Sequence, residues 1–161
     1  MNRKRSKVIP GTLDGLDAWM GDAIGLFIFS DVKPLAGVAG FVDWRACGAL
    51  SRTLEGHNFE GARGESMLLS AKMRSSYRRL FVFGLGSTSD VDAGIMRNEC
   101  RKAVQAMKDA GVVEISLAAP ASRSKKDLEK EFVRAAATAI FSELSAVFVE
   151  EVNDELAGLF V

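Results

Sequence analysis

The sequence predicts an α/β protein of three layers, in which helices cover both faces of a mixed, largely parallel sheet. Short apolar runs bounded by glycine, proline or polar residues recur along the chain, as in buried strands. After residue 64 these runs alternate with segments whose apolar residues recur every three or four positions, as in amphipathic helices. The 161 residues are enough for one domain, so residues 1–161 are treated as a single unit.

The first half of the chain is expected to hold two strands and one helix. The run DAIGLFIFS, Asp22–Ser30, is typical of a buried strand, and Glu65–Lys72 is typical of a second one. Asp43 is expected to cap a helix that ends at Gly56. The residues at helical spacing are Trp44, Cys47, Leu50, Ser51 and Leu54. The intervening GHNFEGARGE has three glycines and predicts a loop.

The run RRLFVFGLG, Arg78–Gly86, predicts the centre of the sheet. It is apolar on both faces from Leu80 to Phe83, which suits a strand covered by helices on each side. A helix is expected to begin at Asp90 or Asp92 and to end at Gly111. Its apolar face consists of Met96, Cys100, Ala103, Val104 and Met107.

The last third is expected to add a strand over Val112–Pro120 and a helix capped by Ser124. The apolar stripe of that helix consists of Leu128, Phe132, Ala135, Ala136, Ala139 and Ile140. Val147–Val149 favours a strand, whereas Glu150–Leu159 is compatible with a helix or with a turn and strand.

Charge and composition exclude several classes of protein. The 21 basic and 21 acidic residues cancel, which argues against a broad nucleic-acid surface. Residues 1–8 are the exception, because Arg3, Lys4, Arg5 and Lys7 form a basic segment. We expect a mobile tail there, with an arm for an acidic partner such as nucleic acid as the alternative.

Location is predicted from what the sequence lacks. It has no apolar run of membrane-spanning length and no secretory signal. Cys47 and Cys100 are expected to be free, buried thiols, because neither has CxxC spacing. A cytoplasmic protein is therefore expected.

The glycines at the end of the central strand raise the question of a phosphate site. Gly84 and Gly86 begin like the dinucleotide motif G-x-G-x-x-G, but Ser89 stands where its third glycine belongs. We expect these glycines mainly to turn the chain. The alternative is a ligand loop in which the backbone faces an anion. Its residues are Gly84, Leu85, Gly86, Ser87 and Thr88, with Asp22 at the start of the first strand.

Other chemistry finds little support in the residues. His57, the only histidine, lies in a glycine-rich loop and is expected to be an exposed turn residue. One histidine and two distant cysteines do not make a standard zinc site. No catalytic residue, no metal ligand and no cofactor is predicted, and enzymatic activity is not expected.

The order of the motifs resembles the N-terminal domain of the leucyl aminopeptidase, or cytosol aminopeptidase, family. The segments are DAIGLFIFSD, GVAGFVDWRACGALSRTLEGHNFEGARGESMLL and RRLFVFGLG, in that order. The likeness is good over about residues 17–118 and loose over 119–145. It implies a fold like that of macro domains. The family's two-metal site lies in a separate C-terminal domain with an NTDAEGR motif, which is absent here, so no catalytic residue carries over.

The resemblance implies a stand-alone, non-catalytic domain for oligomer assembly, protein interaction or regulation. In that family the N-terminal domain contributes to subunit assembly, and some bacterial members bind DNA. We therefore expect a homo-oligomer or a protein partner. The alternative is a macro-like binder of a nucleotide or ADP-ribose, although no NAAN-like segment is present. Metal-dependent aminopeptidase activity is the least supported alternative.

Overall fold

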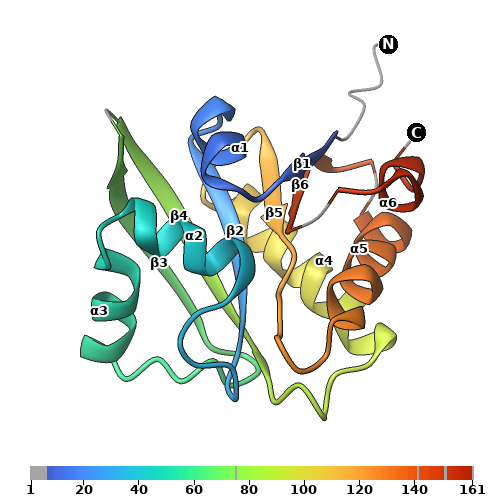
Figure 1. Ribbon diagram of the computed structural model, residues 1–161, viewed down its shortest axis with the longest axis horizontal. Coiled ribbons are helices and arrows are strands. Elements are labelled where there is room, and N and C mark those ends of the chain that lie inside the picture. Colours follow the sequence, from blue (N-terminus) through green and yellow to red (C-terminus); the bar gives the residue numbers. More distant parts are fainter. Residues whose placement is uncertain (1–6, 75, 141, 151, 161) are drawn as a thin grey trace.

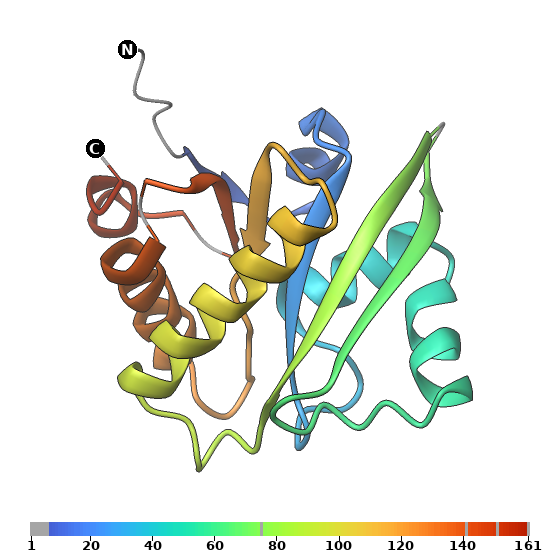
Figure 2. The same cartoon turned by 180° about the vertical axis from the view of Figure 1, so that it is seen from behind.

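The computed structural model describes residues 7–74, 76–140, 142–150 and 152–160. It confirms the predicted three-layer α/β/α arrangement around a mixed, largely parallel sheet (Figures 1 and 2). Over these described ranges the sheet has six strands in the order β1-β6-β5-β2-β4-β3, and among them only β3 is antiparallel to its neighbour. The strands are β1 (Lys7–Pro10), β2 (Ala23–Phe29), β3 (Ser66–Met73), β4 (Ser76–Gly86), β5 (Ile115–Ala118) and β6 (Leu144–Val149).

In the part of the chain that the structure describes, three helices cover each face of the sheet. The first three pack on one face: α1 (Leu13–Ala18), α2 (Gly37–Arg45) and α3 (Ala49–Gly56). The last three pack on the other: α4 (Ala93–Asp109), α5 (Asp127–Ile140) and α6 (Asp154–Gly158). Figure 1 shows α2 in front of the sheet, and Figure 2 shows α4 in front of it when the molecule is turned.

The core follows from the two strands that are apolar on both faces. Every residue of β2 is buried, and its alternate side chains enter the two opposite hydrophobic clusters. In β4, Leu80 and Val82 face α1–α3 while Phe81 and Phe83 face α4, and all four are buried. The prediction of a doubly covered central strand is confirmed.

The long helix α4 also forms as expected. Asp92 caps it by accepting a hydrogen bond from the Ile95 amide at 2.8 Å. Its predicted apolar face is buried against β4 and β5. Ser124 was expected to cap the next helix, but α5 begins three residues later, at Asp127. The Ser124 hydroxyl lies 3.0 Å from that of Ser122.

The single helix expected over residues 43–56 is wrong, because the segment contains two helices. α2 begins earlier, at Gly37, and ends at Arg45. The chain then turns at Cys47 (φ 54°) and Gly48 (φ 76°), both left-handed, before α3 starts. Asp43 does act as a cap, but for α3: its carboxylate accepts hydrogen bonds from the Ser51 amide and hydroxyl. Cys47 is exposed rather than buried.

The ends of the chain also differ from the expectation. Lys7 and Val8, expected in a mobile tail, belong to β1, because Val8 and Ile9 pair with β6 and pack on the two cores. Arg3, Lys4 and Arg5 lie outside the described residues. The segment after β6 forms a short helix, α6. None of the helices in the described parts of the chain is long and apolar enough to cross a membrane.

Candidate functional site

The best candidate site lies where neighbouring parallel strands send their connections in opposite directions. β2 continues through α2 toward β3 and β4, whereas the adjacent β5 continues through α5 toward β6 on the other side. Their carboxyl ends therefore diverge, and a crevice opens between the segments that follow them. Ligands of open α/β sheets bind at this kind of position.

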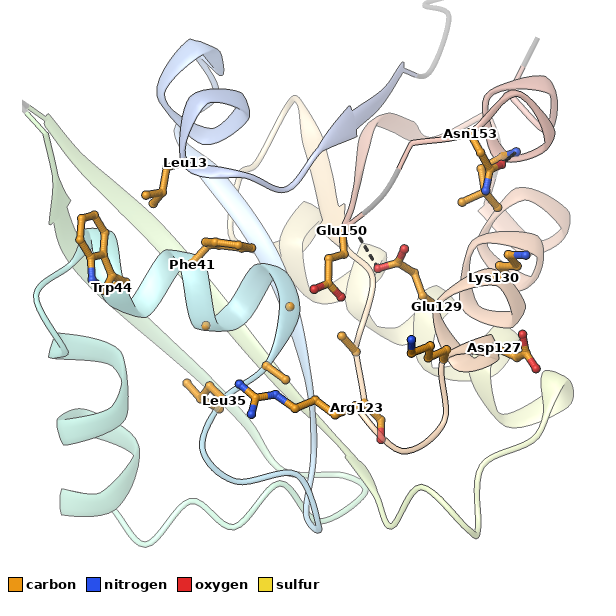
Figure 3. Close-up of a pocket in the computed structure, with 17 residues that line it drawn as sticks. Leu13, Leu35, Phe41, Trp44, Arg123, Asp127, Glu129, Lys130, Glu150 and Asn153 are labelled. Carbon is orange, nitrogen blue, oxygen red and sulfur yellow. Dashed lines mark hydrogen bonds between the residues drawn. The ribbon is translucent and has the colours of Figure 1, made fainter.

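A cleft of about 930 Å³ occupies this position (Figure 3). Its walls are the segments that follow β1, β2, β5 and β6. The volume lies at the upper end of the range of small-molecule sites, roughly 300–1,000 Å³. The residues that line it include Leu13, Ala36, Gly37, Phe41, Trp44, Ala121, Arg123, Lys126, Glu129 and Glu150.

The N-terminus of α2 opens into this cleft. Ala36 stands at the N-cap position, and no side chain caps the helix. The amides of the first turn have no partner inside a helix, and the helix dipole adds partial positive charge there. Gly37 is required at this point, because its φ is +59° and a Cβ would lie 2.5 Å from the Ala121 Cβ. The backbone of α2 thus lies close to the loop that follows β5.

Charged side chains of both signs line the opposite wall. Figure 3 shows Arg123 reaching toward Leu35, and Glu150 between α2 and α5. Within the described part of the chain, Arg123 has no hydrogen bond or ion pair, and neither has the Glu150 carboxylate. The Glu150 amide donates a 2.9 Å hydrogen bond to the Glu129 carboxylate. An anion and a cation could both be paired in this region.

The other end of the cleft is apolar. α2 turns Gly37, Gly40, Phe41 and Trp44 toward it, at the i, i+3, i+4, i+7 spacing of one helix face. Leu13 of α1 faces Phe41 across the gap (Figure 3). The side chain of Trp44 is 66% exposed, which leaves a large aromatic surface in solvent at the mouth of the cleft.

The glycines after β4 are needed for close packing with the loop before β3. A Cβ on Gly84 would lie 2.1 Å from the Ala62 carbonyl oxygen. The Gly84 amide donates to the Glu65 carbonyl and the Gly86 amide to the Gly61 carbonyl, at 2.9 and 2.8 Å. Gly86 has a φ of +80°, which favours glycine. Leu85 is fully buried.

The polar end of this loop is filled by the protein's own carboxylate. Asp31 accepts hydrogen bonds from the Thr88 amide at 3.0 Å and from the Thr88 hydroxyl at 2.7 Å. The Ser87 hydroxyl lies 3.4 Å from the same carboxylate. The hydrogen bond from the Thr88 hydroxyl lowers the pKa of Asp31, and this effect outweighs the opposite effect of burial. The anion that this loop holds in the structure is therefore Asp31.

The adjacent loop is filled in the same way. The Glu65 carboxylate accepts hydrogen bonds from three successive amides, those of Glu60, Gly61 and Ala62, at 2.8–3.1 Å. Successive amides that converge on one point form an anion-binding concavity. Here Glu65 occupies it, so this loop also binds an internal anion.

Asp22 lies at the amino ends of the parallel strands, whereas the other residues of the predicted ligand loop lie at their carboxyl ends. It precedes the amino end of β2, whereas Gly84–Thr88 lie at the carboxyl end of β4. Its carboxylate pairs with Arg79 at 2.8 Å. The structure brings Gly84, Leu85, Gly86, Ser87 and Thr88 together and leaves Asp22 apart.

His57 is exposed, as expected, and its Nδ1 lies 2.9 Å from the Thr53 carbonyl oxygen. Among the described residues, no three His, Cys, Asp or Glu side chains are grouped so that they could hold a metal ion.

Sequence reasoning missed the cleft residues that matter most here: Arg123, Glu150, Phe41 and the start of α2. A signal for two of them was present, because Glu150 directly follows the run Val147–Val149 and Arg123 comes three residues after the run Val112–Pro120, and both runs are expected to be strands. The carboxyl ends of parallel strands meet at one edge. A parallel arrangement of these two strands brings both residues to the same end of the sheet.

Comparison with known sequences identifies a family. The family described as "Cytosol aminopeptidase family, N-terminal domain" matches residues 23–145. A probable cytosol aminopeptidase of Cyanothece sp. is 28% identical over 79 residues, and one of Rippkaea orientalis is 27% identical over 79. These matches cover 49% of this chain but 16% of each relative, so the chain spans a small part of their length.

Comparison with solved structures gives two kinds of neighbour. A mutant of tomato leucine aminopeptidase superposes with a TM-score of 0.65 at 14% identity, covering 99% of this chain and 36% of that one. An Oceanobacillus iheyensis macrodomain with ADP gives 0.61 at 15% identity, covering 99% and 90%. A Trypanosoma brucei macrodomain in complex with ADP gives 0.61 at 16%, covering 95% and 66%. At sequence identities this low, the superpositions establish a shared fold and nothing further.

Proposed function

Because this chain belongs to the cytosol aminopeptidase family through the N-terminal domain, we propose that it is a non-catalytic, ligand-binding unit of that family. In this proposal a small ligand lies in the cleft between α2 and α5, with an anionic group at the start of α2. A ligand that binds the native state alone stabilises that state, so its binding can be measured as a rise in melting temperature.

The observation that carries the proposal is the uncapped start of α2 in the cleft. The loops that bind anions elsewhere at this edge are filled, one by Asp31 and one by Glu65. α1, α4 and α6 are capped by Thr12, Asp92 and Asn153. α2 has no such side-chain cap, so the amides of its first turn are left for a ligand, with Arg123 nearby as a counter-charge (Figure 3).

Two ligand chemistries supply such an anion. One is a phosphate, as in a nucleotide or ADP-ribose. The fold favours it, because two macrodomain neighbours were solved with ADP. The other is a carboxylate on a small organic molecule. Fold analogy alone does not decide between them, so both belong in the test.

The test is a thermal-shift and calorimetric screen with ADP-ribose, ADP and small carboxylates. We expect at least one of them to raise the melting temperature, and Arg123→Ala to abolish that shift. Lys125→Ala is the matched control, because Lys125 is exposed in the same loop but does not line the cleft. The proposal fails if no compound binds, or if binding is indifferent to Arg123.

Self-association is a second candidate function, favoured by the exposed end of the sheet. β3 is an edge strand, and Leu68 and Tyr77 on the β3–β4 hairpin are 52% and 68% exposed. Figure 2 shows these strands extending beyond α4. Exposed apolar side chains on an edge strand favour pairing with another chain. Light scattering coupled to gel filtration should detect a dimer that Leu68→Lys dissociates; a monomer at high concentration contradicts this role.

A further inference from the structure

The charged residues that line the cleft are balanced in sign. The basic ones are Arg123, Lys126 and Lys130, and the acidic ones are Asp127, Glu129 and Glu150. A ligand with two or three negative charges would meet carboxylates as well as cations, and like charges at close range are repulsive. A ligand that carries one charge of each sign leaves neither side unmatched. The balance therefore favours a zwitterion over a nucleotide.

We propose that the cleft binds a free α-amino acid with a large apolar side chain, such as leucine or phenylalanine. This inference rests on the proposed function, since it names the ligand of the same cleft. The carboxylate of the amino acid lies at the first-turn amides of α2, with Arg123 as its counter-ion. The ammonium group lies at the Glu150 carboxylate, which projects into the cleft between α2 and α5 (Figure 3).

The distance from the start of α2 to the apolar end of the cleft suits the side chain of such an amino acid. Gly37 and Phe41 are four residues apart on α2, which corresponds to about 6 Å along the helix axis. An extended leucine or phenylalanine side chain spans a similar length. It would contact Phe41 from α2 and Leu13 from α1, which face each other in Figure 3. Trp44 lies one turn farther out and borders the remaining, solvent-filled part of the cleft.

Each part of the ligand can be tested by removing it. Calorimetry is carried out with L-leucine, L-phenylalanine, glycine, N-acetyl-L-leucine and L-leucinamide. We expect leucine to bind about 10-fold or more tightly than glycine, because an apolar side chain is buried. The acetylated form lacks the ammonium group and the amide lacks the carboxylate, so both should bind at least about 10-fold more weakly than leucine.

Glu150→Gln separates the two ligand classes by the sign of its effect. It should weaken leucine binding about 10-fold or more, because the partner of the ammonium group is lost. It should strengthen binding of ADP-ribose, if that binds at all, because a repulsive carboxylate is removed. Glu131→Gln is the matched control, since Glu131 is exposed on α5 outside the cleft. Melting temperatures without ligand show that each variant is folded.

The outcomes distinguish this inference from the function on which it rests. Leucine binding that needs both Arg123 and Glu150 supports both. ADP-ribose binding that needs Arg123, without leucine binding, overturns the inference and leaves the proposed function standing. If none of these compounds binds, both are wrong. Leucine binding that is unchanged in Glu150→Gln also overturns the inference.

Discussion

The Asp31 carboxylate accepts hydrogen bonds from both donors of Thr88, the amide at 3.0 Å and the hydroxyl at 2.7 Å. The two residues are 57 positions apart, so this contact ties the end of β2 to the loop after β4. The loop that looked most like a phosphate cradle is thereby closed by the protein itself. An added anion would have to displace a carboxylate that is already hydrogen-bonded.

We expect Asp31 to stabilise the fold in a pH-dependent way. Its pKa is lowered in the folded protein, chiefly by the Thr88 hydroxyl. A group of this kind contributes stability above its unfolded pKa, about 3.9, and loses that contribution as the pH falls through the folded pKa. Asp31→Asn should therefore lower the melting temperature at pH 7, and the difference from wild type should shrink below about pH 4.

Asp90→Asn serves as the control for this titration, because Asp90 is exposed in the same loop. It should behave like wild type across the pH range. An equal loss of melting temperature in Asp31→Asn at pH 7 and at pH 3 would mean that the charge of Asp31 is not what stabilises the loop.

Substitution by alanine should reduce the free energy of unfolding by different amounts at Gly84 and Gly86. Gly84→Ala places a Cβ 2.1 Å from a backbone oxygen, and we expect a loss of about 3 kcal/mol or more in the free energy of unfolding. Gly86 has room, with its nearest neighbour at 3.7 Å, but a φ of +80°, so alanine should cost about 1 kcal/mol. Denaturant unfolding measures both.

Gly56→Ala is the control for the glycine pair, because it ends α3 with nothing within 4 Å of a new Cβ. Its free energy of unfolding should stay within about 0.5 kcal/mol of wild type. If Gly84→Ala is as well tolerated as Gly56→Ala, the close approach of the two loops is not present in solution.

The two thiols should react at very different rates. Cys47 is exposed in the turn between α2 and α3, whereas Cys100 is buried on α4. Burial raises the pKa of Cys100 to about 12, and the thiolate is the reactive form. A thiol reagent at pH 8 should therefore modify Cys47 in the native protein and both cysteines in denaturant. Rapid native modification of Cys100, seen by mass spectrometry, would contradict the packing of α4.

The sequence predicts those parts of the fold in which neighbouring residues carry the signal. The apolar runs of β2 and β4 and the spacing of α4 with its Asp92 cap are local patterns, and all three form. The break between α2 and α3 was missed, because it requires Cys47 in a left-handed conformation that few residues other than glycine adopt.

The candidate site was harder to predict, because its parts meet only in three dimensions. Gly37, Arg123 and Glu150 lie in three segments far apart in the sequence, and each looks like an ordinary loop residue. Glycines after a strand were the visible signal, yet their partners, Asp31 and Ala62, come from elsewhere in the chain. A motif shows that a backbone approaches something closely, but not whether that neighbour is a ligand or the protein.

In our proposal the start of α2, and not the loop after β4, receives the ligand. NMR titration of the ¹⁵N-labelled protein with L-leucine and, separately, with ADP-ribose distinguishes these two positions. We expect the amide signals of Gly37, Val38 and Ala39 to shift together with that of Arg123, while those of Gly84–Thr88 stay in place. Shifts confined to Gly84–Thr88, or no shift with either compound, would contradict it.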